Sequence, residues 1–198
     1  MGQKKRLWLE KLRKIKGFSQ EEIANLVHID RSYYSKIESG VRIPSPTLAE
    51  DLADWLNFHV SIFELEESPF YFALQDAPMI VAHFNLNLEY TWIFNPHPDF
   101  DAVSVIGMND VELKDNPGTR ELMELKRNVI AECKPLRKSI RFPMSDGFYT
   151  YDVSCHPLFN EKGELIGGSS ASTELSKADR IETSNCNHSS ENLTLIKE

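Results

Sequence analysis

The chain has 198 residues, of which 41% are hydrophobic and 26% charged, and its formal net charge is −8. This length suits one large or two small domains, and no apolar run reaches the ~18 residues that a membrane-spanning helix needs. The start, MGQKKRLWLEK, lacks the apolar region of a secretory signal. The three cysteines, Cys133, Cys155 and Cys186, are widely spaced and form neither a metal-type pair nor a disulfide framework. We therefore expect a protein of the reducing cytoplasm.

The charge is divided unevenly along the chain. Residues 1–42 contain ten Lys and Arg against five Asp and Glu, a net of +5. The other 156 residues contain twelve Lys and Arg against twenty-five Asp and Glu, a net of −13. A nucleic acid would be attracted to the first part and repelled by the second, so any contact with DNA is expected at the N-terminal end.

The N-terminal part shows helical spacing and clear helix starts. A first helix carries the apolar stripe Leu9, Leu12 and Ile15 and ends at Gly17. Ser19 followed by Glu22 forms a capping box, in which each side chain can satisfy a backbone N–H at the start of a second helix.

A third helix follows after a tight turn at His28 and Ile29. Asp30 is its expected N-cap, Tyr34 and Ile37 fall on one face, and Gly40 stops it. The opposite face is polar and can donate hydrogen bonds to base edges and phosphates; it consists of Arg31, Ser32, Tyr33 and Lys36. Two short helices arranged in this way are typical of DNA reading rather than catalysis.

Two more helices complete this part. Ser45 can cap a fourth helix and Pro46 suits its first turn. The residues expected to face inward are Leu48, Leu52, Ala53 and Leu56. A short fifth helix starts at Ser61, which gives about five helices in fewer than 70 residues.

Residues 3–66 closely resemble the DNA-binding domain of phage repressors (Cro/repressor, Xre-type). The matching motif is LRKIKGFSQEEIA, then SYYSKIESG, then a proline and a leucine-rich helix. In that family the residue at Gln20 contacts a phosphate and those at Ser39 and Arg42 contact the DNA backbone, while the base-reading positions correspond to Arg31, Ser32, Tyr33 and Lys36. The resemblance also implies a structural ion pair between Arg13 and Glu38.

Residues 68–175 are richer in aromatic and β-branched residues. Strands are predicted at Met79–Asn85 and Glu89–Asn95, a helix at Leu122–Glu132, and three further strands at RKSIRFPM, GFYTYDVSCHPLF and LIGGSSAST. Asp146–Gly147 is a hairpin signal.

This order of elements, with DAPMIVAHFNLN, VIGMNDVEL and HPLFNEKGELIGGSSASTEL, resembles a PAS domain. The resemblance implies an α+β domain with an antiparallel five-stranded sheet and flanking helices. We therefore expect a helix-turn-helix domain at 1–66, a PAS-like sensor and dimerisation domain at 67–175, and a polar, disordered tail at 176–198.

PAS domains enclose a pocket between sheet and helices. Here it would be lined by Phe84, Trp92, Phe94, Ile106, Phe142, Tyr151 and His156. The alternative is that these side chains only fill the core. No histidine has the context of a haem ligand and no flavin-domain cysteine motif is present, so the sequence implies no required cofactor or metal and leaves a small-molecule ligand unidentified.

The function that the sequence favours is a bacterial-type, dimeric transcriptional regulator. Its partners would be a double-stranded DNA operator, a second copy of the chain and a small ligand or protein at the PAS-like domain. The alternative is a constitutive or antitoxin-like repressor whose second domain only dimerises or holds a protein partner. An enzyme is disfavoured, because the chain has no Ala-Gly self-cleavage site, no H-x-H cupin motif and no room for an ATP-binding domain.

Overall fold

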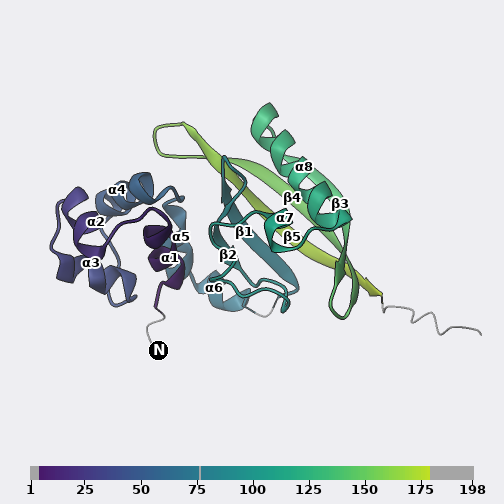
Figure 1. Cartoon of the computed structure of the whole chain (residues 1–198), viewed down its shortest axis with the longest axis horizontal. Helices are drawn as coiled ribbons and strands as arrows, with labels where there is room; N and C mark the ends of the chain where they lie inside the picture. The colour runs from purple at the N-terminus through teal and green to yellow at the C-terminus, as the bar shows by residue number, and fades with distance from the viewer. Residues whose placement is uncertain (1–4, 76, 179–198) are drawn as a thin grey trace, which may run out of the picture.

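The computed structural model describes residues 5–75 and 77–178. A helical domain comes first and a domain built around one β-sheet follows, as Figure 1 shows. The short helix α6 (Pro69–Ala73) joins them. The two-domain fold expected from the sequence, all-α and then α+β, is confirmed.

The helical domain contains α1 (Leu7–Ile15), α2 (Gln20–Leu26), α3 (Arg31–Glu38), α4 (Pro46–Leu56) and α5 (Ser61–Glu67). The capping box at Ser19 forms both of its hydrogen bonds. Ser45 caps α4 by accepting from the Leu48 amide, with Pro46 at the first helical position. Asp30 is the N-cap residue of α3 but makes no capping hydrogen bond with its side chain.

Side chains from all five helices form the core of the helical domain. The fully buried ones include Leu9, Ile23, Tyr34, Ile37, Leu52, Leu56 and Ile62. One predicted core residue behaves differently. Ile15 is 51% exposed, and its side chain lies against Gly107 of the second domain, where an added Cβ would come within 2.3 Å of it. The apolar stripe of α1 therefore contacts both the core of the helical domain and the second domain.

The sheet has five antiparallel strands in the order β2-β1-β5-β4-β3. Their bounds are β1 (Met79–Asn85), β2 (Tyr90–Phe94), β3 (Leu136–Met144), β4 (Gly147–Phe159) and β5 (Leu165–Ala178). Between β2 and β3 lie α7 (Asp110–Leu113) and α8 (Pro117–Glu132). α8 starts earlier than predicted because Asn116 caps it and Pro117 fits its first turn. β5 continues five residues beyond the expected strand end at Thr173 and three beyond the expected domain end at 175, so residues 176–178, predicted as part of the tail, belong to the sheet.

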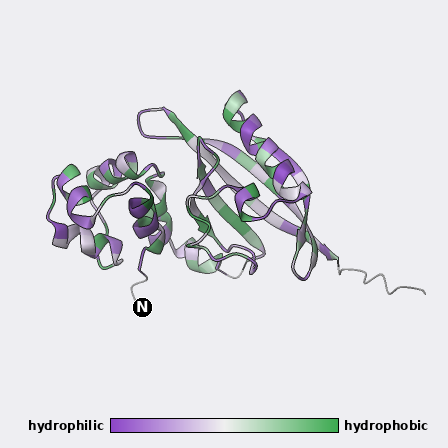
Figure 2. Ribbon diagram, in the orientation of Figure 1, coloured by the Kyte–Doolittle hydropathy of each residue, from purple (hydrophilic) through white to green (hydrophobic). Residues whose placement is uncertain are grey.

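Helix α8 packs on one face of this sheet. Leu122, Leu125 and Val129 form a buried cluster with Ile140 and Val153 of the strands. The residues on the outward face of α8 are hydrophilic, so the helix alternates in colour along its length in Figure 2.

A β-bulge in β2 turns the end of this strand, so that its last aromatic side chains lie on the face of the sheet opposite α8. Phe84 of β1 pairs with Tyr90, whereas the preceding residue His83 pairs with Trp92, so Thr91 is an extra residue. Strand side chains alternate between faces, and the extra residue reverses the alternation. Tyr90 therefore faces α8, while Trp92 and its second neighbour Phe94 face away from it.

Trp92 and Phe94 lie in the same buried cluster as the core of the helical domain, together with Ile106. The Tyr71 ring of α6 packs on Phe94 with centroids 4.9 Å apart. Polar contacts at the edge of this interface join His59 Nε2 to the Phe159 carbonyl at 3.1 Å and Lys162 to Asp54 at 2.6 Å. The domains are thus joined by a continuous apolar core, and α3 lies on the side away from the sheet (Figure 1).

Candidate functional site

Helix α3 presents a polar, solvent-facing surface opposite its buried face. Tyr34, Ile37 and Glu38 are buried. The predicted base-reading residues Arg31, Ser32 and Lys36 are exposed and Tyr33 is half-buried; of the predicted phosphate-contacting residues, Arg42 is exposed, and Gln20 and Ser39 are half-buried. The structure therefore places none of these seven residues in the core.

Arg42 is held against the end of α3. Its guanidinium lies 4.7 Å from the centroid of the Tyr33 ring, a cation–π contact. Its amide donates to the Lys36 carbonyl at 2.9 Å, and its own carbonyl accepts from Arg6 Nη1 at 2.8 Å. Both the main chain and the head group of Arg42 are thereby positioned beside the polar face of α3.

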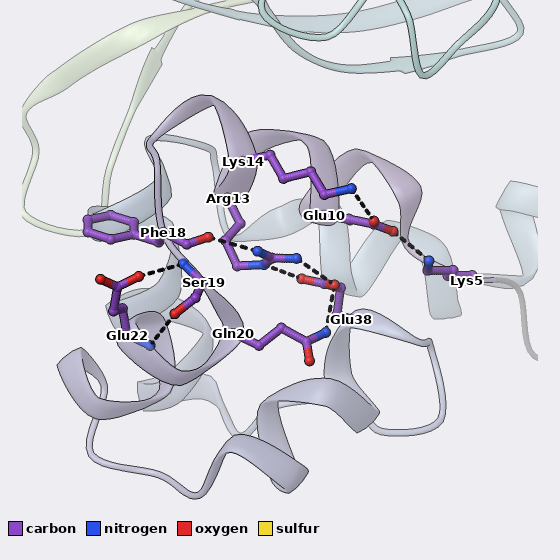
Figure 3. A network of polar contacts seen from close by, with 9 residues as sticks. All are labelled: Lys5, Glu10, Arg13, Lys14, Phe18, Ser19, Gln20, Glu22 and Glu38. Atoms are coloured by element: carbon purple, nitrogen blue, oxygen red, sulfur yellow. Dashed lines mark hydrogen bonds and ion pairs between the residues drawn. The ribbon is translucent and has the colours of Figure 1, made fainter.

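A buried ion pair links α1 to α3, as the sequence predicted. Arg13 Nε donates to Glu38 Oε2 at 2.7 Å, and Arg13 Nη2 donates to Glu38 Oε1 at 3.1 Å. Arg13 also donates to the Phe18 carbonyl at 2.7 Å, between α1 and α2 (Figure 3). Burial raises the pKa of Glu38, but the hydrogen bonds from Arg13 and Gln20 outweigh it and keep the pKa below its usual value.

Gln20, at the start of α2, is tied to this pair. Its amide Nε2 donates to Glu38 Oε1 at 2.9 Å (Figure 3). A side-chain amide has two N–H donors, so Gln20 can keep this bond and still offer one N–H to a phosphate. The buried pair thus fixes a residue at the start of α2.

The second domain contains a partly open cavity of about 80 Å³ between the sheet and α7–α8. Its wall is mainly apolar and comes from β1, β2, β3, α8 and the loop before α7, including Ile80, Ala82, Ile93, Phe100, Val105, Leu122 and Met144. Polar groups at the wall belong to His97, Asp110, Asn116, Thr119, Ser170 and Ser172. Such a mixture of apolar surface and few polar groups is characteristic of small-molecule sites.

A buried charge pair lies behind this wall. Lys126 is fully buried, and its Nζ lies 2.6 Å from Asp110 Oδ2 and 3.9 Å from the centroid of the Tyr90 ring. The Tyr90 hydroxyl donates to Asp110 Oδ1. Burial, together with the Asp110 carboxylate, raises the pKa of Tyr90 well above its ordinary value, so Tyr90 stays a hydrogen-bond donor.

The seven residues predicted for a pocket are not brought together. Phe142 and Tyr151 line the cavity. Trp92, Phe94 and Ile106 pack against the helical domain instead. For Trp92 and Phe94 the reason is the bulge at Thr91, which turns the end of β2 to the other face.

The remaining two predicted residues also lie elsewhere. Phe84 is on the cavity side of β1 but packs with Leu88 and Met123 beyond its end. His156 is exposed, on a position of β4 whose side chain faces away from α8.

Several lining residues were missed by the sequence interpretation. The alternation of Ile80, Ala82 and Phe84 in β1 was a signal for one inward face. His97 and Asn116 lie in loops and at a helix cap, where no periodicity marks a buried side.

Two features are absent from the described residues, 5–75 and 77–178. They contain no group of three or more His, Cys, Asp or Glu that could hold a metal ion. None of their helices is long and apolar enough to cross a membrane.

Comparisons with known proteins agree with this geometry. A family model described as Helix-turn-helix matches residues 9–63. YqaF of Bacillus subtilis (strain 168), an uncharacterized HTH-type transcriptional regulator, is 45% identical over 58 residues, which is 29% of this chain and 76% of YqaF. Histidine kinase 5 of Arabidopsis thaliana is 32% identical over 98 residues, or 49% of this chain, but the match spans only 11% of the kinase.

Among solved structures, a Vibrio cholerae VqmA dimer is similar, with 16% identity and a TM-score of 0.48 over 55% of this chain and 52% of VqmA. The strand order β2-β1-β5-β4-β3, with the helices between β2 and β3, is itself that of a PAS-like domain. The buried core, the polar α3 and the match to YqaF across most of its length place the N-terminal domain in one group of regulators: the chain belongs to the Xre-type helix-turn-helix family of DNA-binding proteins.

Proposed function

We propose that this protein is a sequence-specific transcriptional regulator that binds a double-stranded operator as a dimer. The observation that carries the proposal is the solvent-facing polar side of α3, held on a helical core by the Arg13–Glu38 pair. In this fold α3 enters the major groove, and two copies read half-sites about one helical turn apart.

Within this proposal the polar residues divide into two roles. Arg31, Ser32, Tyr33 and Lys36 read base edges, and Gln20, Ser39 and Arg42 contact phosphates. Base-edge contacts determine which sequence is bound, whereas phosphate contacts fix position and supply salt-dependent affinity. The anchored Gln20 amide and the Arg42 head group stacked on Tyr33 support the second role.

The PAS-like domain, residues 67–175 with the end of β5, would modulate DNA binding by taking up a small ligand in its cavity. Support comes from β1, whose successive side chains lie on opposite faces of the sheet. Ile80 and Ala82 line the cavity, while Val81 packs against the helical domain and His83 lies beside His59. A ligand that fits the docked and undocked arrangements of the two domains unequally would shift their populations. We propose binding, not catalysis, as the activity of both domains.

The alternative function, a regulator whose second domain only dimerises or holds a protein partner, is favoured by the small size of the cavity, about 80 Å³. The predicted polar tail is also relevant to the choice between a ligand-sensing and a partner-binding second domain, but its residues from 179 onward lie outside the described part of the chain.

The DNA-binding proposal is tested by Arg31→Ala combined with Lys36→Ala. Operator fragments would first be selected from random DNA with the full-length protein and then measured by gel shift. Loss of one bidentate base contact costs about 1–3 kcal/mol of discrimination, so the double variant should lose sequence-specific binding.

The matched control is Arg127→Ala with Lys134→Ala, which removes the same charge from exposed positions of the second domain. It should keep operator affinity and specificity. Equal specific affinity of wild type and the α3 variant would contradict the assigned DNA-reading surface.

A further inference from the structure

The core cavity opens toward a groove on the surface. The groove, of about 400 Å³, runs along Gln75, Ala77–Ile80, Asn95–Pro98 and the side of β4. Cavity and groove share Ile80, Pro96, His97 and Tyr151 in their walls. A molecule entering from solvent through this groove would therefore pass the His97 side chain.

The charged and capping groups at the cavity wall are already satisfied. Both carboxylate oxygens of Asp110 are bonded, one to the Tyr90 hydroxyl and one to Lys126. Asn116 and Thr119 bond each other in the capping box of α8, with Asn116 Oδ1 accepting from the Thr119 amide at 3.0 Å. A charged ligand would thus find no free counter-charge there, and an unpaired buried charge is costly.

His97 is the exception. It is only 7% exposed, and its Nε2 is buried without a hydrogen-bond partner. The nearest carboxylate oxygen, Asp146 Oδ1, is 3.9 Å away, which is too far for a hydrogen bond. Leaving such a group unpaired destabilises the protein, so a partner supplied from outside would be favoured.

The main chain determines which hydrogen atom His97 offers. The Asp99 amide donates to His97 Nδ1 at 3.1 Å, so Nδ1 is an acceptor. In the neutral ring the other nitrogen then carries the hydrogen. His97 Nε2 is therefore a donor that needs an acceptor.

The loop that supplies this bond is itself held in place. Asp99 Oδ2 accepts from the Ser145 amide at 2.9 Å and from Lys114 Nζ at 3.1 Å, and the Ser145 hydroxyl donates to its other oxygen. The hydrogen bonds from Ser145, with that from Lys114, lower the pKa of Asp99 to about 2. Position and tautomer of His97 are thus both set before any ligand arrives.

From these contacts we infer that the cavity binds a compact, uncharged, mainly apolar molecule with one hydrogen-bond acceptor, such as a carbonyl, which receives the Nε2–H of His97. This inference rests on the proposed sensor function of the PAS-like domain and names its ligand class. The apolar part lies between β1, β2 and α8, and the acceptor lies at the His97 side, where cavity and groove meet. The cavity of about 80 Å³ takes only a small body, since a benzene ring occupies an engineered cavity of about 150 Å³, and any longer portion continues into the groove.

The test is a titration of the full-length protein with butan-2-one, followed by the methyl resonance of Met144. Met144 lines the cavity, whereas the buried Met123 packs in another cluster and serves as the internal reference. Butan-2-amine, protonated at neutral pH, has the same carbon skeleton but carries a charge in place of the acceptor.

Two variants of His97 separate its hydrogen bond from its structural role. His97→Asn retains an acceptor for the Asp99 amide but removes the Nε2 donor, whereas His97→Gln places an N–H donor near the Nε2 position. We expect saturable Met144 shifts with the ketone for wild type and for the Gln variant, at least about five-fold weaker binding to the Asn variant, and no saturable shift with the amine.

Three results would overturn the inference: no saturable shift at Met144, equal ketone affinity in the Asn variant, or amine binding as tight as ketone binding. The gel-shift experiment on α3 is performed without ketone, so its result does not depend on the result of the ketone titration. Loss of the proposed DNA function together with a His97-dependent ketone site would refute the first proposal and leave the ligand site standing.

Discussion

The interface between the two domains should weaken when the solution is acidified, because of His83. This side chain is 8% exposed, its ring lies 6.0 Å from that of His59 and 5.5 Å from that of Trp92, and its Nδ1 has no hydrogen-bond partner. Burial, with a smaller contribution from His59, lowers the pKa of His83 from 6.5 to about 4. The folded chain therefore resists protonation here.

The sign and the size follow from this difference in pKa. Below pH 6.5 the unfolded chain binds a proton that the folded chain does not, so the stabilisation present at higher pH is lost as the pH falls from 6.5 toward 4. One pKa unit corresponds to about 1.4 kcal/mol, so the limiting loss is about 3 kcal/mol, of which about 2 kcal/mol falls between pH 7 and pH 5.

Urea unfolding followed by tryptophan fluorescence at pH 7 and pH 5 would measure this loss. His83→Gln is the control, since glutamine does not titrate and all other ionisable groups stay the same. We expect the free energy of unfolding of the wild type to fall between these pH values by about 2 kcal/mol more than that of the variant. The same pH dependence in both proteins would refute the assignment to His83.

Two further perturbations address the interior of the second domain and its contact with the helices. Lys126→Ala leaves Asp110 as an unpaired buried charge and should destabilise the protein by about 3–5 kcal/mol in urea unfolding; combining Lys126→Met with Asp110→Asn should recover most of that loss, and a failure to recover it would mean that packing, not charge, is the cause. Trp92→Ala should cost about 3–5 kcal/mol by opening the core shared by both domains and speed proteolytic cleavage near α6, whereas Leu86→Ala, at a position 51% exposed, should change neither.

The helical domain could be predicted closely because its information is local. Caps and stops such as Ser19, Ser45 and Gly40 act on neighbouring backbone groups, and each helix has one apolar face. Even the Arg13–Glu38 pair followed from the family resemblance. What local patterns could not show is that Ile15 belongs to a contact between domains, since that depends on the packing of two separate units.

The cavity was harder to predict because tertiary features select its wall. An uninterrupted alternation puts Tyr90, Trp92 and Phe94 on one face, and only the pairing with β1 shows that they divide between two. Lys126 did carry a signal, since it lies four residues after Leu122 and three before Val129 on the inward face of α8. The expectation that a lysine is solvated hid that signal.

The unpaired Thr91 has a consequence for how this strand can change length. Loss of one residue inside a strand normally turns all following side chains to the wrong side. Here it would remove the one residue that has no partner on β1, and Tyr90 and Trp92 would become direct neighbours that still point to opposite sides. A relative with a one-residue gap at this place can therefore preserve both packing surfaces, whereas a relative of equal length without the bulge cannot. In sequence alignments of this strand, a gap would then be a mark of conserved structure.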